Sequence, residues 1–108
     1  MILTHPAREQ LDLAAVLHAL SDPVRLGIVA ALATDDEERT CGSFDVSVTK
    51  STCTHHFRVL REAGLIHQRQ DGTTRLNSLR RDDLEARFPG LLETVLQAAQ
   101  TGGRSPTQ

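Results

Sequence analysis

The stretch TKSTCTHHFRVLREAG, which runs from Thr49 to Gly64, decides how the rest of the chain can be arranged. Its apolar residues Cys53, Phe57 and Leu60 recur at intervals of four and three, the spacing of one face of an α-helix. The spacing therefore predicts an amphipathic helix that ends at Gly64, a residue suited to a left-handed cap. The opposite face is polar and carries Lys50, Ser51, Thr54, His55 and Arg58. Many surface helices share this division, so the function of the polar face has to be inferred from the flanking sequence.

The composition indicates one domain with an aliphatic core. A chain of 108 residues forms a single domain of modest core size, which a dimer interface would help to stabilise. Since it has three Phe and no Trp or Tyr, we do not expect aromatic stacking on bases. No apolar run approaches the roughly 20 residues that cross a bilayer, and the first residues lack the order of a signal peptide. We therefore expect a cytoplasmic protein without a membrane partner, whose two cysteines are reduced.

Positive charge is concentrated around the opening stretch. Residues 1 to 48 hold three Arg and eight acidic residues, a balance of −5, and residues 82 to 108 contribute −2. Residues 49 to 81 hold seven Lys or Arg and two acidic residues, a balance of +5, although the whole chain is −2. Phosphate binding needs local positive charge rather than a basic protein. The segment from 49 to 81 is therefore a candidate to bind nucleic acid.

Three shorter elements are predicted before the opening stretch. Residues 1 to 7 are expected to form a flexible arm, and an apolar stripe from Arg8 to Leu20 predicts the first helix. Ser21 or Asp22 can cap a second, buried helix that has Pro23 in its first turn. An acidic connection then leads to a short third helix or turn at residues 40 to 45.

The sequence after Gly64 predicts a hairpin and a final helix. Two alternating segments flank Asp71-Gly72, a strong signal for a two-residue turn, so they predict a two-stranded wing. Ser78 can cap a last apolar helix that begins near Arg80 and is bent or broken at Pro89-Gly90. Residues 8 to 100 would then form the domain, and residues 101 to 108 a disordered tail.

This order of elements is that of a winged helix-turn-helix domain, mainly α with a small β-hairpin (α-α-α-α-β-β-α). The segments LHALSDPVRLGIVAAL (17 to 32) and STCTHHFRVLREAGLI (51 to 66), followed by the wing, resemble the ArsR/SmtB family of small bacterial repressors. The resemblance covers residues 11 to 96. Its most specific part is the pattern S/T-x-H-h-x-V-L-R-E-A-G-L, which is met from Thr54 to Leu65.

The resemblance implies a transcriptional regulator that binds double-stranded DNA. It implies a homodimer through the first and last helices, with two recognition helices in successive major grooves of a pseudo-palindromic operator. It also implies a repressor whose operator affinity is modulated by a metal ion or another effector. The matching DNA-contact positions are Lys50, Ser51, Thr52, Thr54, His55 and Arg58 in the recognition helix and Arg69, Thr73, Thr74 and Arg75 in the wing. Arg61 is open between DNA and an intrachain salt bridge.

The metal sites of the family are not reproduced by this sequence. The third-helix region has Cys41 without the second cysteine of a Cys-x-Cys pair, and the last helix has no histidine. Cys53 and His56 lie one turn apart and could bind zinc with Cys41, but zinc needs about four ligands. We favour the alternative in which Cys53 fills the core and His56 bonds to the backbone of a neighbouring helix. A redox role for Cys41 and Cys53 is open.

A second candidate metal site lies near the N-terminus. His5 on the arm, with His18 of the first helix or acidic residues of the partner's last helix, would make a nitrogen and oxygen site suited to nickel, cobalt or zinc. The alternative is a disordered arm and a solvent-facing His18.

Two rival functions have to be compared with DNA binding. A protein-interaction module of the same fold would act through a partner co-regulator and would have no effector site of its own. An enzyme would need a nucleophile, a base and a group that orients the base, and Cys53 with His56 is the one candidate pair. We therefore predict that the chain is not an enzyme.

Overall fold

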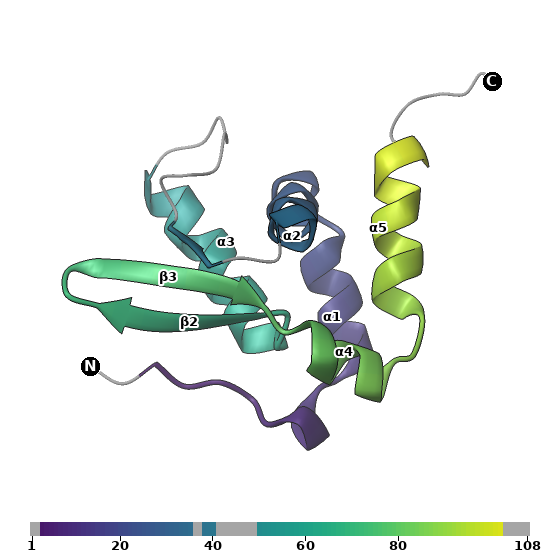
Figure 1. Cartoon of the computed structure of the whole chain (residues 1–108), viewed down its shortest axis with the longest axis horizontal. Helices are drawn as coiled ribbons and strands as arrows, with labels where there is room; N and C mark the ends of the chain where they lie inside the picture. The colour runs from purple at the N-terminus through teal and green to yellow at the C-terminus, as the bar shows by residue number, and fades with distance from the viewer. Residues whose placement is uncertain (1–2, 36–37, 41–49, 103–108) are drawn as a thin grey trace.

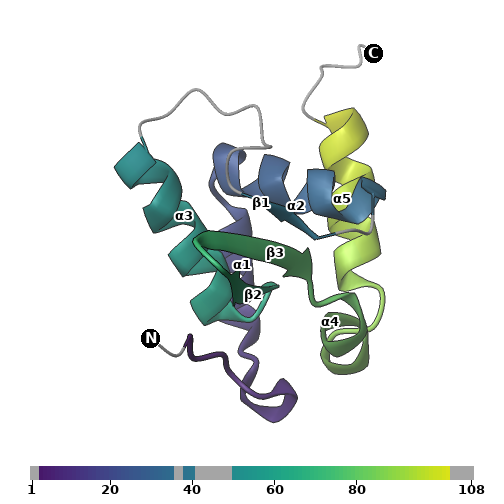
Figure 2. The same ribbon diagram turned by 60° about the vertical axis from the view of Figure 1, so that its left-hand side comes forward.

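The computed structural model describes residues 3 to 35, 38 to 40 and 50 to 102. The elements follow the order η1 (Arg8–Gln10), α1 (Leu13–Leu20), α2 (Pro23–Asp35), β1 (Arg39–Thr40), α3 (Lys50–Ala63), β2 (Ile66–Asp71), β3 (Thr74–Leu79), α4 (Arg81–Arg87) and α5 (Leu91–Gly102). Figures 1 and 2 show α3 and α5 on opposite sides of the molecule, with α1 and α2 between them. The predicted class, mainly helical with a β-hairpin, is confirmed. The third helix predicted at 40 to 45 lies beyond Thr40 outside the described residues.

The first helix begins later than predicted. A short 3-10 turn at Arg8–Gln10 is followed by two non-helical residues, and α1 starts at Leu13. Asp12 is the reason, because its backbone is extended and its Oδ2 accepts a hydrogen bond from the Ala15 N–H at 3.0 Å. The helix start expected at Arg8 was therefore wrong. The apolar residues recur without a break in the sequence, but the cap at Asp12 ends the short turn and starts a new helix.

The turn into α2 matches its prediction. Asp22 Oδ2 accepts from the Val24 and Arg25 N–H groups at 2.9 and 3.1 Å, and Pro23 is the first residue of the helix. These bonds satisfy two of the N–H groups that a helix leaves without partners at its start. Asp22 thus fixes the point at which the chain turns from α1 into α2.

One aliphatic core joins the helices to the base of the hairpin. Phe57 is the one aromatic side chain among the buried hydrophobics of the described residues, as the composition indicated. Gly64 has a φ of +88° and ends α3, and a Cβ placed there would lie 2.0 Å from Leu11 Cδ2. The buried apolar residues are Leu11, Val16, Ala19, Leu20, Ile28, Val29, Leu32, Phe57, Leu60, Ala63, Leu65, Ile66, Leu84 and Leu92.

The sheet has the strand order β1-β3-β2, all antiparallel. The two-residue strand β1 was not predicted, and it pairs with Leu76 and Asn77. It takes up the last residue of the expected connection and Thr40, where the third helix or turn was wrongly expected to begin. The hairpin is confirmed, but its turn is one residue further along than predicted. Asp71 pairs with Thr74, so the loop is Gly72-Thr73, and Gly72 takes the positive φ of +65° that primed turns need at the first position.

The C-terminal helix is broken where predicted. Helices α4 and α5 are separated by residues 88 to 90, and Gly90 has a φ of +80°. Ser78 was expected to cap this region, but it lies within β3 and the residue before α4 is Arg80. Helix α5 continues to Gly102, two residues into the predicted tail, and residues 103 to 108 are outside the described residues.

Candidate nucleic-acid interface

Helix α3 has one buried and one exposed face, as its spacing predicted. Phe57 and Leu60 are 1% and 0% exposed, and burial of each contributes about 1.5–3 kcal/mol. Cys53 is partly buried and packs against the same core. The opposite face is exposed at Ser51, Thr52, Thr54, His55 and Arg58. Lys50 is the first residue of the helix, and its side chain lies outside the described ones. The buried face therefore holds the helix, and the polar face points to solvent.

A buried arginine that the sequence analysis missed fixes the position of α3. Arg25 is 7% exposed and donates from Nε to the Ala19 carbonyl at 2.7 Å and from Nη2 to the His18 carbonyl at 3.3 Å. Its Nη1 lies 3.2 Å from His56 Nδ1 on α3. Because a guanidinium can only donate, Nδ1 is the acceptor. A single side chain thus joins the end of α1, the start of α2 and helix α3.

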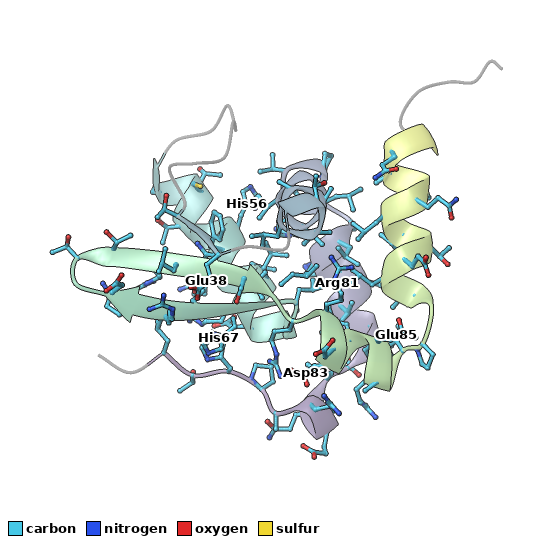
Figure 3. The ribbon with its side chains drawn as sticks, in the orientation of Figure 1. Glu38, His56, His67, Arg81, Asp83 and Glu85 are labelled. Carbon is cyan, nitrogen blue, oxygen red and sulfur yellow. The ribbon has the colours of Figure 1, made fainter. Side chains whose placement is uncertain are left out.

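The second nitrogen of His56 faces a carboxylate. His56 lies between α3 and α2 in Figure 3, and its Nε2 is 3.9 Å from Asp22 Oδ2. The backbone N–H of Arg25, followed by the neighbouring His56, the Val24 N–H and the guanidinium of Arg25, lowers the pKa of Asp22. His56 therefore contacts the side chains of Arg25 and Asp22, and the expected bond to a neighbouring backbone was wrong.

The wing has two chemically different faces. Side chains alternate across a strand, so the register places Ile66, Gln68 and Gln70 on one face with their partners on β3. This inner face is turned towards α3, since Gln68 and Asn77 are 2% and 0% exposed and Gln68 contacts Arg61 of that helix. The inner face comprises Ile66, Gln68, Gln70, Arg75, Asn77 and Leu79, and the outer face comprises His67, Arg69, Asp71, Thr74, Leu76 and Ser78.

A polar relay ties the inner face to the recognition helix. Arg61 Nη1 donates to Gln68 Oε1 at 2.8 Å, and Gln68 Nε2 donates to Asn77 Oδ1 at 2.7 Å. Arg61 thus bonds to a neutral amide, not to the acidic partner considered from sequence. The relay fixes the distance between α3 and both strands of the hairpin. Arg61 Nε is the buried side-chain nitrogen that keeps no hydrogen-bond partner in the described part of the chain.

The predicted wing contacts are divided between the two faces. On the outer face, Arg69 donates from Nε and Nη2 to the two carboxylate oxygens of Glu38 at 2.7 and 2.8 Å. The hydrogen bond and charge of Arg69 lower the pKa of Glu38. Thr74 is exposed on the same face, Thr73 is exposed in the loop, and Arg75 is on the inner face. Arg69 therefore already has an anionic partner 31 residues away, which spacing could not indicate.

The N-terminal segment, expected to be a flexible arm, is described from Leu3 onward and lies along the edge strand β2 (Figures 1 and 3). His5 Nε2 accepts from the Gln68 backbone N–H at 3.0 Å, and its ring stacks on His67 with centroids 4.4 Å apart. Arg80 donates to the Pro6 carbonyl at 2.8 Å. Burial, followed by the charges of His67, Arg61 and Arg80, lowers the pKa of His5.

An arginine pair also anchors the segment to α4. Asp83 accepts from Arg8 Nε at 2.7 Å and from Arg80 Nε at 2.9 Å, and these bonds lower its pKa. Residues 5 to 8 are thus attached to the wing, to Arg80 and to α4.

Comparison with known proteins agrees with this geometry. A family model described as a helix-turn-helix domain matches residues 20–69. The chain is 40% identical over 84 residues to the uncharacterized HTH-type transcriptional regulator YceK of Bacillus subtilis (strain 168), covering 76% of this chain and 84% of the relative. This chain belongs to the ArsR-type helix-turn-helix transcriptional regulators. The ArsR-type chain is also similar in structure to the transcriptional repressor BigR from Xylella fastidiosa, with a TM-score of 0.60, 27% identity and coverage of 78% of this chain and 82% of BigR.

A second solved structure supports the fold alone. An ArsR family transcriptional regulator superimposes with a TM-score of 0.59 over 82% of this chain and 91% of its own, at 22% identity.

The family consists of DNA-binding transcriptional regulators, which are not enzymes. The one pair considered for catalysis fits this conclusion, because both nitrogens of His56 face Arg25 and Asp22 rather than being left for Cys53.

The metal candidates of this ArsR-type chain are not gathered in one place within the described residues. Among residues 3 to 35, 38 to 40 and 50 to 102, no three His, Cys, Asp or Glu side chains form a group that could hold a metal ion. His5 lies on the edge of the wing, whereas His18 is exposed in the last turn of α1. Cys41, the third candidate beside Cys53 and His56, is outside the described residues.

The described helices were also tested as membrane spans. None of them alone combines the length and hydropathy required for crossing a bilayer; Leu13–Leu20 and Pro23–Thr34 meet the criterion only as a pair bent by 100°.

Proposed function

We propose that this regulator is a homodimeric repressor that binds a pseudo-palindromic operator through α3 and the wing, and that an effector changes its operator affinity. The observation that carries the proposal is the division of α3. Phe57 and Leu60 are buried, while hydroxyls, an imidazole and a guanidinium cover the exposed face. The Arg25–His56 contact holds this helix against α1 and α2 and leaves its polar face outward.

The contacts would follow the chemistry of the exposed side chains. Arg58 suits the N7 and O6 acceptors of a guanine or a phosphate, and Thr54 and His55 suit base edges or phosphates. Lys50 belongs to the set by its position at the start of α3. Ser51 and Thr52 in the first turn, and Thr73 and Thr74 at the wing tip, would position the protein on the backbone. Arg75 would add a cation from the inner face. Arg69 stays bonded to Glu38 on the outer face and would add only a weaker attraction for the backbone.

The dimer proposal is supported by an apolar surface on α1. In the described part of the chain, Leu13 and Leu17 are the large apolar side chains left exposed, each at 45%. They are one helical turn apart and so form one patch. On α5, Leu91, Val95 and Leu96 are only partly buried. A second copy that covers both helices would remove this surface from water, and light scattering on the purified chain gives the mass that tests it.

For the effector, we propose a nickel, zinc or cobalt ion at His5 or His18, with further ligands from the partner protomer. Ligands from a second chain are part of the proposal because the described residues of one chain hold no group of three. His18 is exposed on α1, near the proposed dimer surface. His5 already accepts the Gln68 N–H, so a metal at its Nε2 would have to displace that bond.

Gel-shift and footprinting with DNA from upstream of the gene test the DNA proposal. We expect a specific complex at moderate salt with protection on two half-sites about one helical turn apart. Lack of any specific complex, with or without metal, would refute it. A complex that forms only through a second protein, and that tolerates Lys50→Ala and Thr54→Ala, would instead favour the protein-interaction module acting with a co-regulator.

The effector proposal has a separate test. The metal-free chain is titrated with nickel, zinc and cobalt while operator binding is followed by fluorescence anisotropy. We expect one ion to weaken binding, and expect His5→Ala or His18→Ala to abolish that response. If every ion leaves operator binding unchanged, the metal proposal is wrong while DNA binding stands.

A further inference from the structure

A groove separates the recognition helix from the inner face of the wing. Its volume is about 370 Å³, and its walls include Thr54, Arg58 and Arg61 from α3 and Gln70, Thr73 and Arg75 from the hairpin. None of the described side chains that line it is acidic. Three guanidinium groups therefore meet around one open space in a chain whose net charge is −2.

The carboxylates of the described residues that pair with arginines do so elsewhere. Glu38 holds Arg69 on the outer face, and Asp83 holds Arg8 and Arg80 beside α4. Within the described residues, Arg58 and Arg75 form no ion pair. Like charges at short range repel one another, and an anion placed between them removes that repulsion. The groove therefore has the electrostatics of an anion site.

The side chain of Arg61, which lines the groove, is already fixed in position by a hydrogen bond. Its Nη1 is fixed by Gln68, which is fixed in turn by Asn77, so the guanidinium has lost much of its rotamer freedom before any ligand arrives. Its Nε is buried without an acceptor. A buried donor left without a partner is costly, and because Nε itself is closed off from solvent, an oxyanion would bind Arg61 through the part of the side chain that lines the groove.

The position of the groove identifies the anion. It lies between the exposed side of α3, represented by Thr54 and Arg58, and the tip of the wing at Thr73. A nucleic-acid backbone that follows both elements passes over this space, and guanidinium groups bind phosphate oxygens through paired N–H donors. We propose that the groove is a phosphate seat, in which Arg58, Arg61 and Arg75 hold one backbone phosphate of the bound DNA.

This inference rests on the proposed DNA-binding function and adds Arg61 to the contacts expected from sequence. Phosphate contacts fix the register of a protein on the duplex without reading its sequence. The seat would therefore set the angle at which α3 enters the major groove, because Arg61 belongs to the relay that spaces α3 from the wing.

The test compares Arg75→Gln, from the seat, with Arg69→Gln, from the outer face of the same hairpin. Binding of the full chain to a duplex carrying its footprinted site is measured by anisotropy over a range of salt. Arg75→Gln is expected to weaken binding about tenfold and to reduce the salt slope by about 0.9, with a smaller change for Arg69→Gln. Arg61→Gln should act like Arg75→Gln, and circular dichroism checks that each variant is folded.

Duplexes with single neutral methylphosphonates locate the phosphate. A methylphosphonate at one position is expected to weaken DNA binding by the wild-type chain and by Arg69→Gln. The same methylphosphonate should have little further effect on DNA binding by Arg75→Gln, which already lacks the cation that holds this phosphate. If the variants of the seat bind like the wild-type chain at every salt, or if no methylphosphonate position couples to Arg75, the seat is refuted although DNA binding holds. If the wild-type chain gives no specific complex at all, the proposed function fails with it.

Discussion

The two faces of the wing present arginines in opposite conditions. On the outer face, Arg69 donates hydrogen bonds to both carboxylate oxygens of Glu38. On the inner face, Arg75 borders the groove beside α3 and forms no ion pair among the described residues. Both arginines belong to one basic segment of the sequence. The difference arises from strand register, since the parity of a position decides which face a side chain joins. Local charge in a sequence thus indicates a binding region, and the register indicates which cations are available.

The largest effect is expected at the recognition helix, which both faces of the wing assist. Arg58→Gln should weaken specific DNA binding by about 2 kcal/mol, or roughly thirtyfold, because the exposed guanidinium supplies a base or phosphate contact. Anisotropy with the footprinted duplex measures the change. Arg8→Gln removes one positive charge that lies next to Asp83 rather than on the exposed face of α3, and is the matched control. Equal losses in both variants would mean that net charge rather than α3 governs binding.

The next largest effect is expected from disrupting the polar relay of the inner face while its arginines are left unchanged. Asn77→Ala should lower the free energy of unfolding by about 1.5 kcal/mol, because the buried Gln68 amide N–H loses its acceptor. Urea denaturation followed by circular dichroism gives the value. Ser78→Ala, at the next position on the outer face, should change it by less than about 0.5 kcal/mol. A neutral result for Asn77→Ala would contradict the role assigned to the relay.

A smaller effect is expected when the arginine of the outer face is freed from its ion pair, so that both faces of the wing carry an arginine that is unpaired among the described residues. Glu38→Gln releases Arg69, so DNA binding should become tighter and its salt slope should steepen by about 0.9. The gain should disappear when Arg69→Gln is added, since the released cation is then absent. A gain that survives in the double variant would show that removal of a negative charge, not release of Arg69, is responsible.

The smallest effect concerns the N-terminal segment on the edge of β2. The pKa of His5 lies below its usual 6.5 when the segment is docked, chiefly through burial and then through His67, Arg61 and Arg80. The undocked segment therefore binds a proton more readily than the docked one. Docking should be complete above pH 6.5 and should weaken as pH falls from there through the lowered pKa of His5. The reason is direct, because a proton on Nε2 would face the Gln68 N–H.

The chemical shift of the Gln68 amide proton reports this docking. We expect it to move as the pH is lowered from 8 to 5, and we expect no such movement in His5→Phe. A chemical shift that does not change with pH in the wild-type chain, or that still changes in His5→Phe, would contradict the docking of the N-terminal segment through His5.

The sequence predicted those parts that depend on local pattern. The period of α3 placed Phe57 and Leu60 in the core, and the cap at Asp22 and the break at Gly90 follow from backbone preferences of short stretches. The hairpin was predicted, but its loop was misplaced by one residue, because Asp71 and Gly72 both suit a turn and only the pairing with β3 distinguishes them.

The remaining features depend on contacts between distant residues. Glu38 meets Arg69 across 31 positions, and Arg25 meets His56 across the same separation. Neither pairing leaves a signal in spacing. Gln68 and Asn77 are polar and read as surface residues, yet the register turns both inward, where Gln68 donates a hydrogen bond to Asn77. The strand β1 is too short to show any period. The missed residues are therefore the ones that position the interface, whereas the exposed face of α3 was readable from sequence.

The central claim is that DNA binds to the exposed face of α3 and to the inner face of the wing. Arginine Nε–Hε signals of the full chain, recorded by NMR during titration with the footprinted duplex, test it most directly. We expect large shifts for Arg58, Arg61 and Arg75 and a small shift for Arg69, which keeps its bond to Glu38. Shifts of Arg69 that equal or exceed those of Arg75, with Arg61 unmoved, would contradict it.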